Sequence, residues 1–200
     1  MKFQNFLKTI ASSALFACAS TSFAHVVLID KSAPAGSAYK ASFLVGHGCD
    51  GSATTGIAVQ IPAGFQGAKP YPKSGWTLAV SKAKLAQPYD SHGKQVTEDV
   101  SVVTWTAASK DAALQDAYVD EFMLRGTLPH TSGPLWFKVL QTCENGSNDW
   151  HEIPASGQST KGLKSPAVLL EVAGHDASRL APAMQMPMPM PMPSHGEHQH

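Results

Sequence analysis

The stretch Val100–Thr106, which reads VSVVTWT, decides the fold class of this chain. Its β-branched and aromatic residues favour extended backbone, and Val100, Val102 and Thr104 alternate with their neighbours. An alternation with a period of two is typical of a half-buried β-strand. The stretch GIAVQI at Gly56–Ile61 repeats the pattern, whereas long segments with the helical period are scarce. The sequence therefore predicts an all-β domain.

Further runs of the same kind lie along the chain between turn signals that contain Gly or Pro. They are His25–Ile29, Ser42–Val45, Thr77–Val80, Glu121–Arg125, Leu135–Gln141 and Val168–Val172. Short strands at these spacings predict a β-sandwich of the immunoglobulin-like or cupredoxin-like type. We interpret Ser109–Ala117 as a helical turn or loop, and Ile153–Ser165 as a long connection before the last strand.

The first 24 residues contain no acidic residue and have the pattern of a secretory signal peptide. A lysine-containing start is followed by the apolar stretch Ile10–Ala19, which is too short to span a membrane, and by small residues in Ser22–Ala24. We predict cleavage after Ala24 and a mature protein, without a membrane span, in the periplasm or outside the cell. Lipidation at Cys18 is the alternative, because residues 15–18 resemble a lipoprotein cleavage box.

Cys49 and Cys143 are the cysteines that remain after such a cleavage. In an exported protein an even pair of cysteines predicts a disulfide. A pair of metal-binding thiolates is the alternative, but no CxxC or CxxH spacing supports it.

The chain thus divides into a signal peptide (residues 1–24), a β-domain (residues 25–181) and a tail (residues 182–200). The tail reads PAMQMPMPMPMPSHGEHQH. Proline at every second place removes backbone donors and excludes a helix, so we expect an extended, disordered tail. Thioethers favour Cu(I), while imidazoles suit Cu(II), zinc and nickel. The composition predicts copper capture, with candidate ligands Met184, Met186, Met188, Met190, Met192, His195, His198 and His200.

His25 becomes the first residue if the chain is cleaved after Ala24. A terminal histidine offers two nitrogens, the α-amine and the ring Nδ1, that close a six-membered chelate on one metal ion. Tetragonal Cu(II) favours such donors. Because copper must displace the proton of an amine whose ordinary pKa is about 7.7–8.0, we expect acidification to weaken binding.

A series of motifs carries a resemblance to a known family. In chain order they are HVV after Ala24, PAGS at Pro34–Ser37, HGCDGSATT at His47–Thr55, VQIP at Val59–Pro62, KPYPKSGW at Lys69–Trp76, DEF at Asp120–Phe122 and WHEIP at Trp150–Pro154. Over about residues 25–172, this order resembles the YcnI-like copper-binding domains of bacterial exported proteins. The resemblance implies a β-sandwich that binds Cu(II) through the mature N-terminal histidine, a monohistidine brace completed by a carboxylate and a tryptophan. Carried over, the brace falls on His25 and the aromatic residue on Trp150.

The remaining ligands stay open. Asp50 and Glu121 are the alternative carboxylates, although Asp50 also suits a turn and Glu121 a solvated strand position. His47 is a further candidate, with a structural role in the turn as the alternative. Trp150 suits either the copper site or the core, and its acidic neighbours predict a partly exposed place.

The function predicted from these features is that of a copper chaperone or storage protein without enzymatic activity. It would bind Cu(II) at His25 and Cu(I) on the tail, and exchange copper with another periplasmic or membrane protein. A copper-dependent oxidase or monooxygenase is the alternative, as is an interaction sandwich with incidental metal affinity. GxSxG, HExxH and phosphate-loop motifs are absent from the sequence. The balance of 15 basic and 15 acidic residues gives no electrostatic reason to expect nucleic acid.

Overall fold

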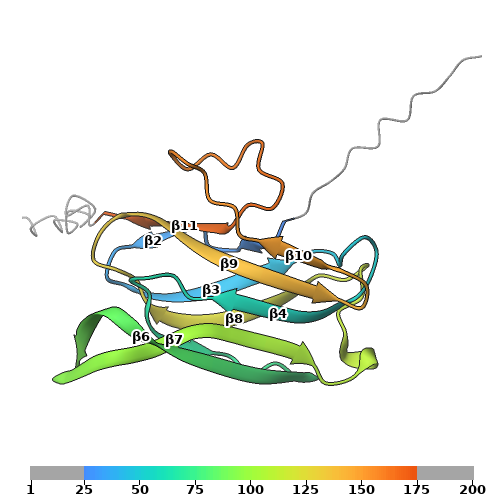
Figure 1. Ribbon diagram of the computed structural model, residues 1–200, viewed down its shortest axis with the longest axis horizontal. Coiled ribbons are helices and arrows are strands. Elements are labelled where there is room, and N and C mark those ends of the chain that lie inside the picture. The colour runs from blue at the N-terminus through green and yellow to red at the C-terminus, as the bar shows by residue number, and fades with distance from the viewer. Residues whose placement is uncertain (1–24, 175–200) are drawn as a thin grey trace, which may run out of the picture.

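Two β-sheets pack against each other in the structure, a computed structural model that describes residues 25–174 (Figure 1). The first sheet has the strand order β1-β3-β8-β5. Its strands are β1 (Val27–Leu28), β3 (Ala38–Val45), β8 (Asp120–Thr127) and β5 (Gln66–Pro70).

The second sheet has the order β2-β11-β9-β4-β7-β6, and β10 pairs with β9 off this path. Its strands are β2 (Ser32–Pro34), β11 (Val168–Ala173), β9 (Gly133–Cys143), β4 (Thr54–Gln60), β7 (Lys94–Ala107), β6 (Trp76–Ser91) and β10 (Ser147–Trp150). A short 3-10 turn, η1 (Lys110–Ala112), lies inside the segment for which we expected a helical turn or loop. The prediction of an all-β sandwich is confirmed.

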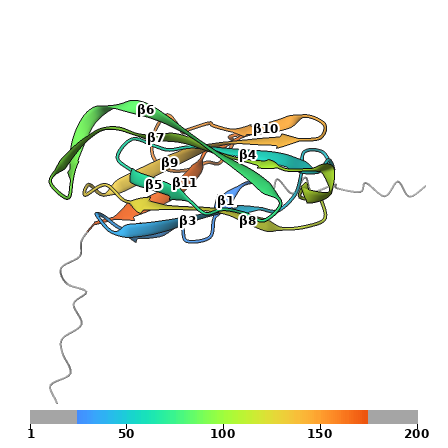
Figure 2. The same ribbon diagram turned by 90° about the horizontal axis from the view of Figure 1, so that it is seen from below.

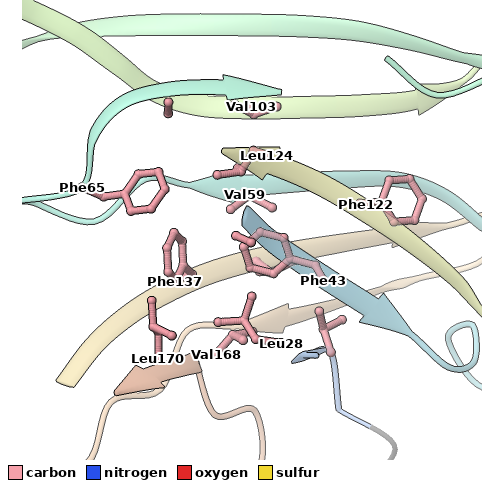
Figure 3. Close-up of a cluster of buried hydrophobic side chains, with 14 of the residues drawn as sticks. Leu28, Phe43, Val59, Phe65, Val103, Phe122, Leu124, Phe137, Val168 and Leu170 are labelled. Carbon is pink, nitrogen blue, oxygen red and sulfur yellow. The ribbon is translucent and has the colours of Figure 1, made fainter. Parts of the chain in front are cut away.

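Apolar side chains from the two sheets fill the space between them (Figure 3). Phe43 of β3 and Phe137 of β9 meet edge to face with ring centroids 5.4 Å apart, and Phe65 meets Phe137 at 5.5 Å. Burial of each such ring stabilises the fold by roughly 1.5–3 kcal/mol. These contacts join the sheets and fix the position of β9 in the middle of the second one.

Strand β9 alternates between buried and more exposed residues as the sequence pattern predicts, but one of its buried residues is polar. Leu135, Phe137 and Val139 are buried, while the residues between them are half-buried or exposed. The inward series continues through Gln141, which is only 1% exposed, to Cys143. A fully buried amide therefore stands where the pattern calls for an apolar residue.

The β6–β7 hairpin is much longer than the expected runs Thr77–Val80 and Val100–Thr106. The two strands pair as far as Ser91 and Lys94, and their outer half forms a curved ribbon beyond the sandwich (Figure 2). His92 and Gly93 both have positive φ, 52° and 77°, as a two-residue turn between twisted strands requires. The polar side chains of this ribbon are exposed on both faces, so they lack the period-two signal by which we recognised strands.

Three short strands, β2, β5 and β10, were not predicted from the sequence. β2 contains Pro34, and β5 contains Gly67 and Pro70. β10 begins with the polar run Ser147–Asp149. Residues of these types have low β propensity, so the local sequence does not predict a strand. Each is held by pairing with a longer neighbour. The connection from Ile153 to Ser165 contains no strand, as expected.

Cys49 and Cys143 form the predicted disulfide, which joins the loop after β3 to the end of β9. Both cysteines are buried, with 3% and 6% exposure. The bridge spans 94 residues of sequence. It therefore restricts the unfolded chain strongly.

Replacing both cysteines by alanine should lower the free energy of unfolding by about 4 kcal/mol, because a loop of this length then gains its full freedom in the unfolded state. Urea denaturation followed by circular dichroism measures the change. An unfolding midpoint equal to that of the unmodified protein would contradict the structural role of the bridge.

Candidate metal site

His25 and Trp150 meet at one edge of the sandwich, although 125 positions separate them in the sequence. Their ring centroids lie 5.2 Å apart, and the ring planes cross at 77°. His25 lies two residues before β1 and is half-buried, whereas Trp150 ends β10 and is 4% exposed. The residue that we expected to become the N-terminus and the aromatic residue assigned by resemblance are thus in contact.

The expectation that Trp150 is partly exposed was wrong. Trp150 pairs with Val139 in the β10–β9 ladder, and residues directly opposite each other share a face of the sheet. Because Val139 faces the core, Trp150 does too. The acidic neighbours Asp149 and Glu152 lie outside this inward position, so their charge did not report on the indole. Trp105 is fully buried, Trp76 is half-buried against the core, and Trp136 is half-buried between the inward residues Leu135 and Phe137 of β9.

The indole of Trp150 is held by Gln141. Trp150 Nε1 donates to Gln141 Oε1 at 3.3 Å. Gln141 Nε2 in turn donates to the carbonyl oxygen of His47 at 2.7 Å and to Thr54 Oγ1 at 2.8 Å. Sequence reasoning missed Gln141, although a polar residue at an inward position of an alternating strand was a usable signal.

His47 lies in the loop between β3 and β4, close to the line of the β1–β3 ladder. Val27 pairs with Leu44, so continuing this register by two residues leads from His25 to position 46, next to His47. His47 Nδ1 contacts the carbonyl oxygen of Gly48. Its Nε2 is shielded from solvent and has no hydrogen-bond partner within the described residues 25–174. A buried imidazole nitrogen without a partner is costly, unless it binds something not present here.

The loop that carries His47 is closely fitted. A Cβ on Gly48 would lie 1.7 Å from the carbonyl oxygen of Ser52, so only glycine fits at this position. Gly48 N–H also donates to Asp116 Oδ1 at 2.9 Å. Cys49 and Ser52 exchange backbone hydrogen bonds of 3.1 and 2.9 Å across the turn. The HGC motif thus builds a rigid turn beside the site.

The two candidate carboxylates differ in their positions. Asp50 is exposed at the tip of the Cys49–Ser52 turn, with a φ of 48° that asparagine and aspartate tolerate in turns. Glu121 is half-buried in β8 opposite Leu44, and Leu44 lies opposite Val27. Glu121 and Val27 therefore lie on the outer face of the first sheet, because their neighbours Phe122 and Leu28 face the core. Neither carboxylate makes a hydrogen bond or ion pair with residues 25–174.

A cavity of about 250 Å³ opens beside His25, where β1 approaches the start of β11. Backbone and side chains of both strands and of the long connection line it: His25, Val27, Lys31, Gln158, Thr160 and Leu169 are among them. His25 therefore borders a solvent-accessible cavity whose lining does not include Trp150.

Within residues 25–174, no three His, Cys, Asp or Glu side chains gather closely enough to hold a metal ion. A chelate at His25 would use one side chain and the α-amine that cleavage creates, so it does not depend on such a cluster. The predicted tail ligands Met184, Met186, Met188, Met190, Met192, His195, His198 and His200 lie outside the described residues, as do the signal peptide and Cys18.

The fold and this contact define an immunoglobulin-like β-sandwich with a histidine–tryptophan pair at its N-terminal edge. The chain belongs to the family described as "Domain of unknown function (DUF1775)", which matches residues 25–172 and is a YcnI-type domain. The YcnI-type domain predicted from the motifs is thereby confirmed, while its copper binding stays a prediction.

One similar solved structure is described as "Crystal structure of an uncharacterized protein from Nocardia farcinica reveals an immunoglobulin-like fold". It has a TM-score of 0.57 and 25% sequence identity over 74% of this chain and 98% of that chain. Of the two sandwich types predicted, the immunoglobulin-like type is therefore supported. No curated protein matches the chain. Across residues 25–174, no helix has the length and hydropathy needed to cross a membrane.

Replacing Trp150 by phenylalanine should lower the free energy of unfolding by roughly 1–3 kcal/mol, because Gln141 Oε1 then loses the indole N–H that it accepts inside the core. Urea denaturation measures the loss. Trp136→Phe is the matched control, since Trp136 is half-buried and makes no side-chain hydrogen bond to residues 25–174. Equal losses in both variants would show that the Trp150–Gln141 bond contributes nothing.

Proposed function

We propose that this chain is an exported copper-binding protein that holds Cu(II) at His25 and stores or delivers copper. The observation that carries the proposal is the contact of His25 with the buried Trp150 at 5.2 Å. His25 directly follows the predicted cleavage point, so processing would give this one residue both an amine and an imidazole donor. Neighbouring residues already hold the indole in place beside it.

The donor chemistry around His25 suits Cu(II). Two nitrogens from one terminal residue match the tetragonal preference of this ion. The solvent-shielded Nε2 of His47 supports a further nitrogen donor from the neighbouring loop. Asp50 and Glu121 remain the carboxylate candidates. Trp150 would shield one side of the ion from water.

The tail extends the proposal to Cu(I). Its thioethers are soft donors, and Met alternates with Pro over residues 186–193. A chain with nitrogen donors at one end and thioethers at the other can hold both oxidation states of copper. The Met- and His-rich tail would capture copper. We propose that the protein then transfers this copper to another periplasmic or membrane copper-handling protein.

Inserting one alanine before His25 should abolish the Cu(II) site of the folded domain, because the α-amine then belongs to another residue. We expect the affinity to fall by about 100-fold or more, since even outer-shell changes cost 10–100-fold. Electron paramagnetic resonance and competition titration of the exported, processed protein measure the effect, and intact mass establishes the first residue.

His151→Ala is the control for this experiment. His151 is an exposed histidine whose Nδ1 lies 3.3 Å from Asp149 Oδ2, so it tests whether any surface imidazole accounts for the signal. The control should retain the unmodified spectrum. An unchanged spectrum and affinity in the alanine-insertion variant would refute the brace at His25.

Deleting residues 182–200 should remove most of the Cu(I) taken up by the protein while leaving the Cu(II) signal unchanged. Titration with a chromophoric Cu(I) competitor measures the stoichiometry. A full-length variant with leucine at the five tail methionines separates thioether binding from chain length and should lose Cu(I) to nearly the same extent. Unaltered Cu(I) stoichiometry in both variants would contradict the tail assignment.

A further inference from the structure

Gln141 is a buried amide whose three side-chain hydrogen bonds join separate parts of the candidate site. It is 1% exposed and lies in β9, the strand that contributes Phe137 and Val139 to the core. Burying a primary amide is unfavourable unless its donors and acceptor are satisfied. Here Nε2 has two acceptors and Oε1 has one donor, all from different segments of the chain.

One side of this amide holds the His47 loop. The donor bond to the carbonyl oxygen of His47 is 2.7 Å long, and the bond to Thr54 Oγ1 is 2.8 Å long. These two acceptors lie at opposite ends of the segment that contains Cys49. The disulfide to Cys143, two residues after Gln141, fastens the middle of that segment to the same strand. The loop is thus attached to β9 at three points.

The other side of the amide sets the indole. Trp150 Nε1 donates to Oε1 at 3.3 Å, which fixes the rotation of the ring whose edge-to-face contact with His25 defines the site. The backbone of β10 already places Trp150 opposite Val139, so the hydrogen bond determines the orientation of the indole within that position. Gln141 therefore acts on both the Trp150 side and the His47 side.

We propose that Gln141 is a positioning residue of the copper site. This inference rests on the proposed Cu(II) binding at His25. Gln141 aligns the indole of Trp150 with His25 and at the same time holds the backbone of His47 through a 2.7 Å hydrogen bond, so that both sides of the site are arranged before the metal arrives. A primary amide suits this role, because it offers two N–H donors and an acceptor from one planar group. Leucine would satisfy none of the three partners. Glutamate would accept from the indole N–H and from the Thr54 hydroxyl, but it has no donor for the carbonyl oxygen of His47.

Gln141→Leu in the full chain, exported and processed, is the first test. Metal-site residues that act through a directly bound ligand typically change affinity by 10–100-fold, and we expect a Cu(II) affinity loss in this range. The EPR hyperfine splitting should change as well, because the nitrogen donors are no longer held in one geometry. In ¹⁵N-labelled apo protein, the Trp150 indole N–H should exchange faster with solvent.

Gln141→Glu is the second variant and is nearly equal to glutamine in size. It keeps an acceptor for the indole N–H but loses the amide donors to His47 and Thr54. We expect slow exchange of the Trp150 N–H to be restored, together with a smaller affinity loss than in Gln141→Leu. Val103→Ala is the control for general destabilisation, since Val103 is fully buried in β7 and takes no part in this network. Its EPR spectrum should match that of the unmodified protein.

The outcomes separate the two proposals. If the unmodified protein shows no Cu(II) at His25, the proposed function fails. If it binds Cu(II) at His25 and both Gln141 variants have the unmodified affinity and spectrum, the positioning role is refuted. If Gln141→Leu does not fold, Gln141→Glu decides: an unmodified affinity and spectrum refute the role, and a partial loss that Val103→Ala does not share supports it.

Discussion

The side-chain amide of Gln141 is the interaction on which the rest of the candidate site depends. It satisfies Trp150 Nε1, the carbonyl oxygen of His47 and Thr54 Oγ1 from a position that is only 1% exposed. Each of these groups would cost roughly 1–3 kcal/mol of stability if it were buried without a partner. The three hydrogen bonds therefore stabilise the packing of the segments that carry Trp150, His47 and Thr54 against β9. A polar network of this kind, when fully satisfied, specifies one arrangement of the core. In this protein the arrangement places the indole of Trp150 against His25.

The sandwich supplies what the amide requires. Strand β9 lies between β4 and β11 and is anchored by Phe137, so Gln141 has a fixed starting point. The β9–β10 hairpin brings Trp150 back over this strand, and β1 brings His25 to the same edge from the opposite sheet. The disulfide fixes the His47 loop close to Gln141. Segments from both ends of the domain thereby meet at the edge that carries His25 and Trp150. This contact depends on the fold and not on a single local motif.

Much of this was predictable from the sequence, and the exceptions have physical reasons. Alternation identified the strands whose one face is buried, and the Cys49–Cys143 bridge followed from the number of cysteines. The outer half of β6–β7 was missed because both of its faces are exposed and carry no alternation. The burial of Trp150 was misjudged because charge at Asp149 and Glu152 reports on those positions alone. The local pattern marks Gln141 only as a polar residue at an inward strand position. Its role depends on partners 87 and 94 residues away, which the local pattern does not identify.

The central claim is that His25, aligned by Trp150 and Gln141, is where this protein holds Cu(II). The most direct measurement is an anomalous difference map at the copper absorption edge, from crystals of the exported, processed protein loaded with one equivalent of Cu(II). We predict a single strong peak within bonding distance of the α-amine and Nδ1 of His25, on the edge of the domain next to Trp150. A peak on another part of the domain, or none at His25 in crystals that contain copper, would contradict this claim.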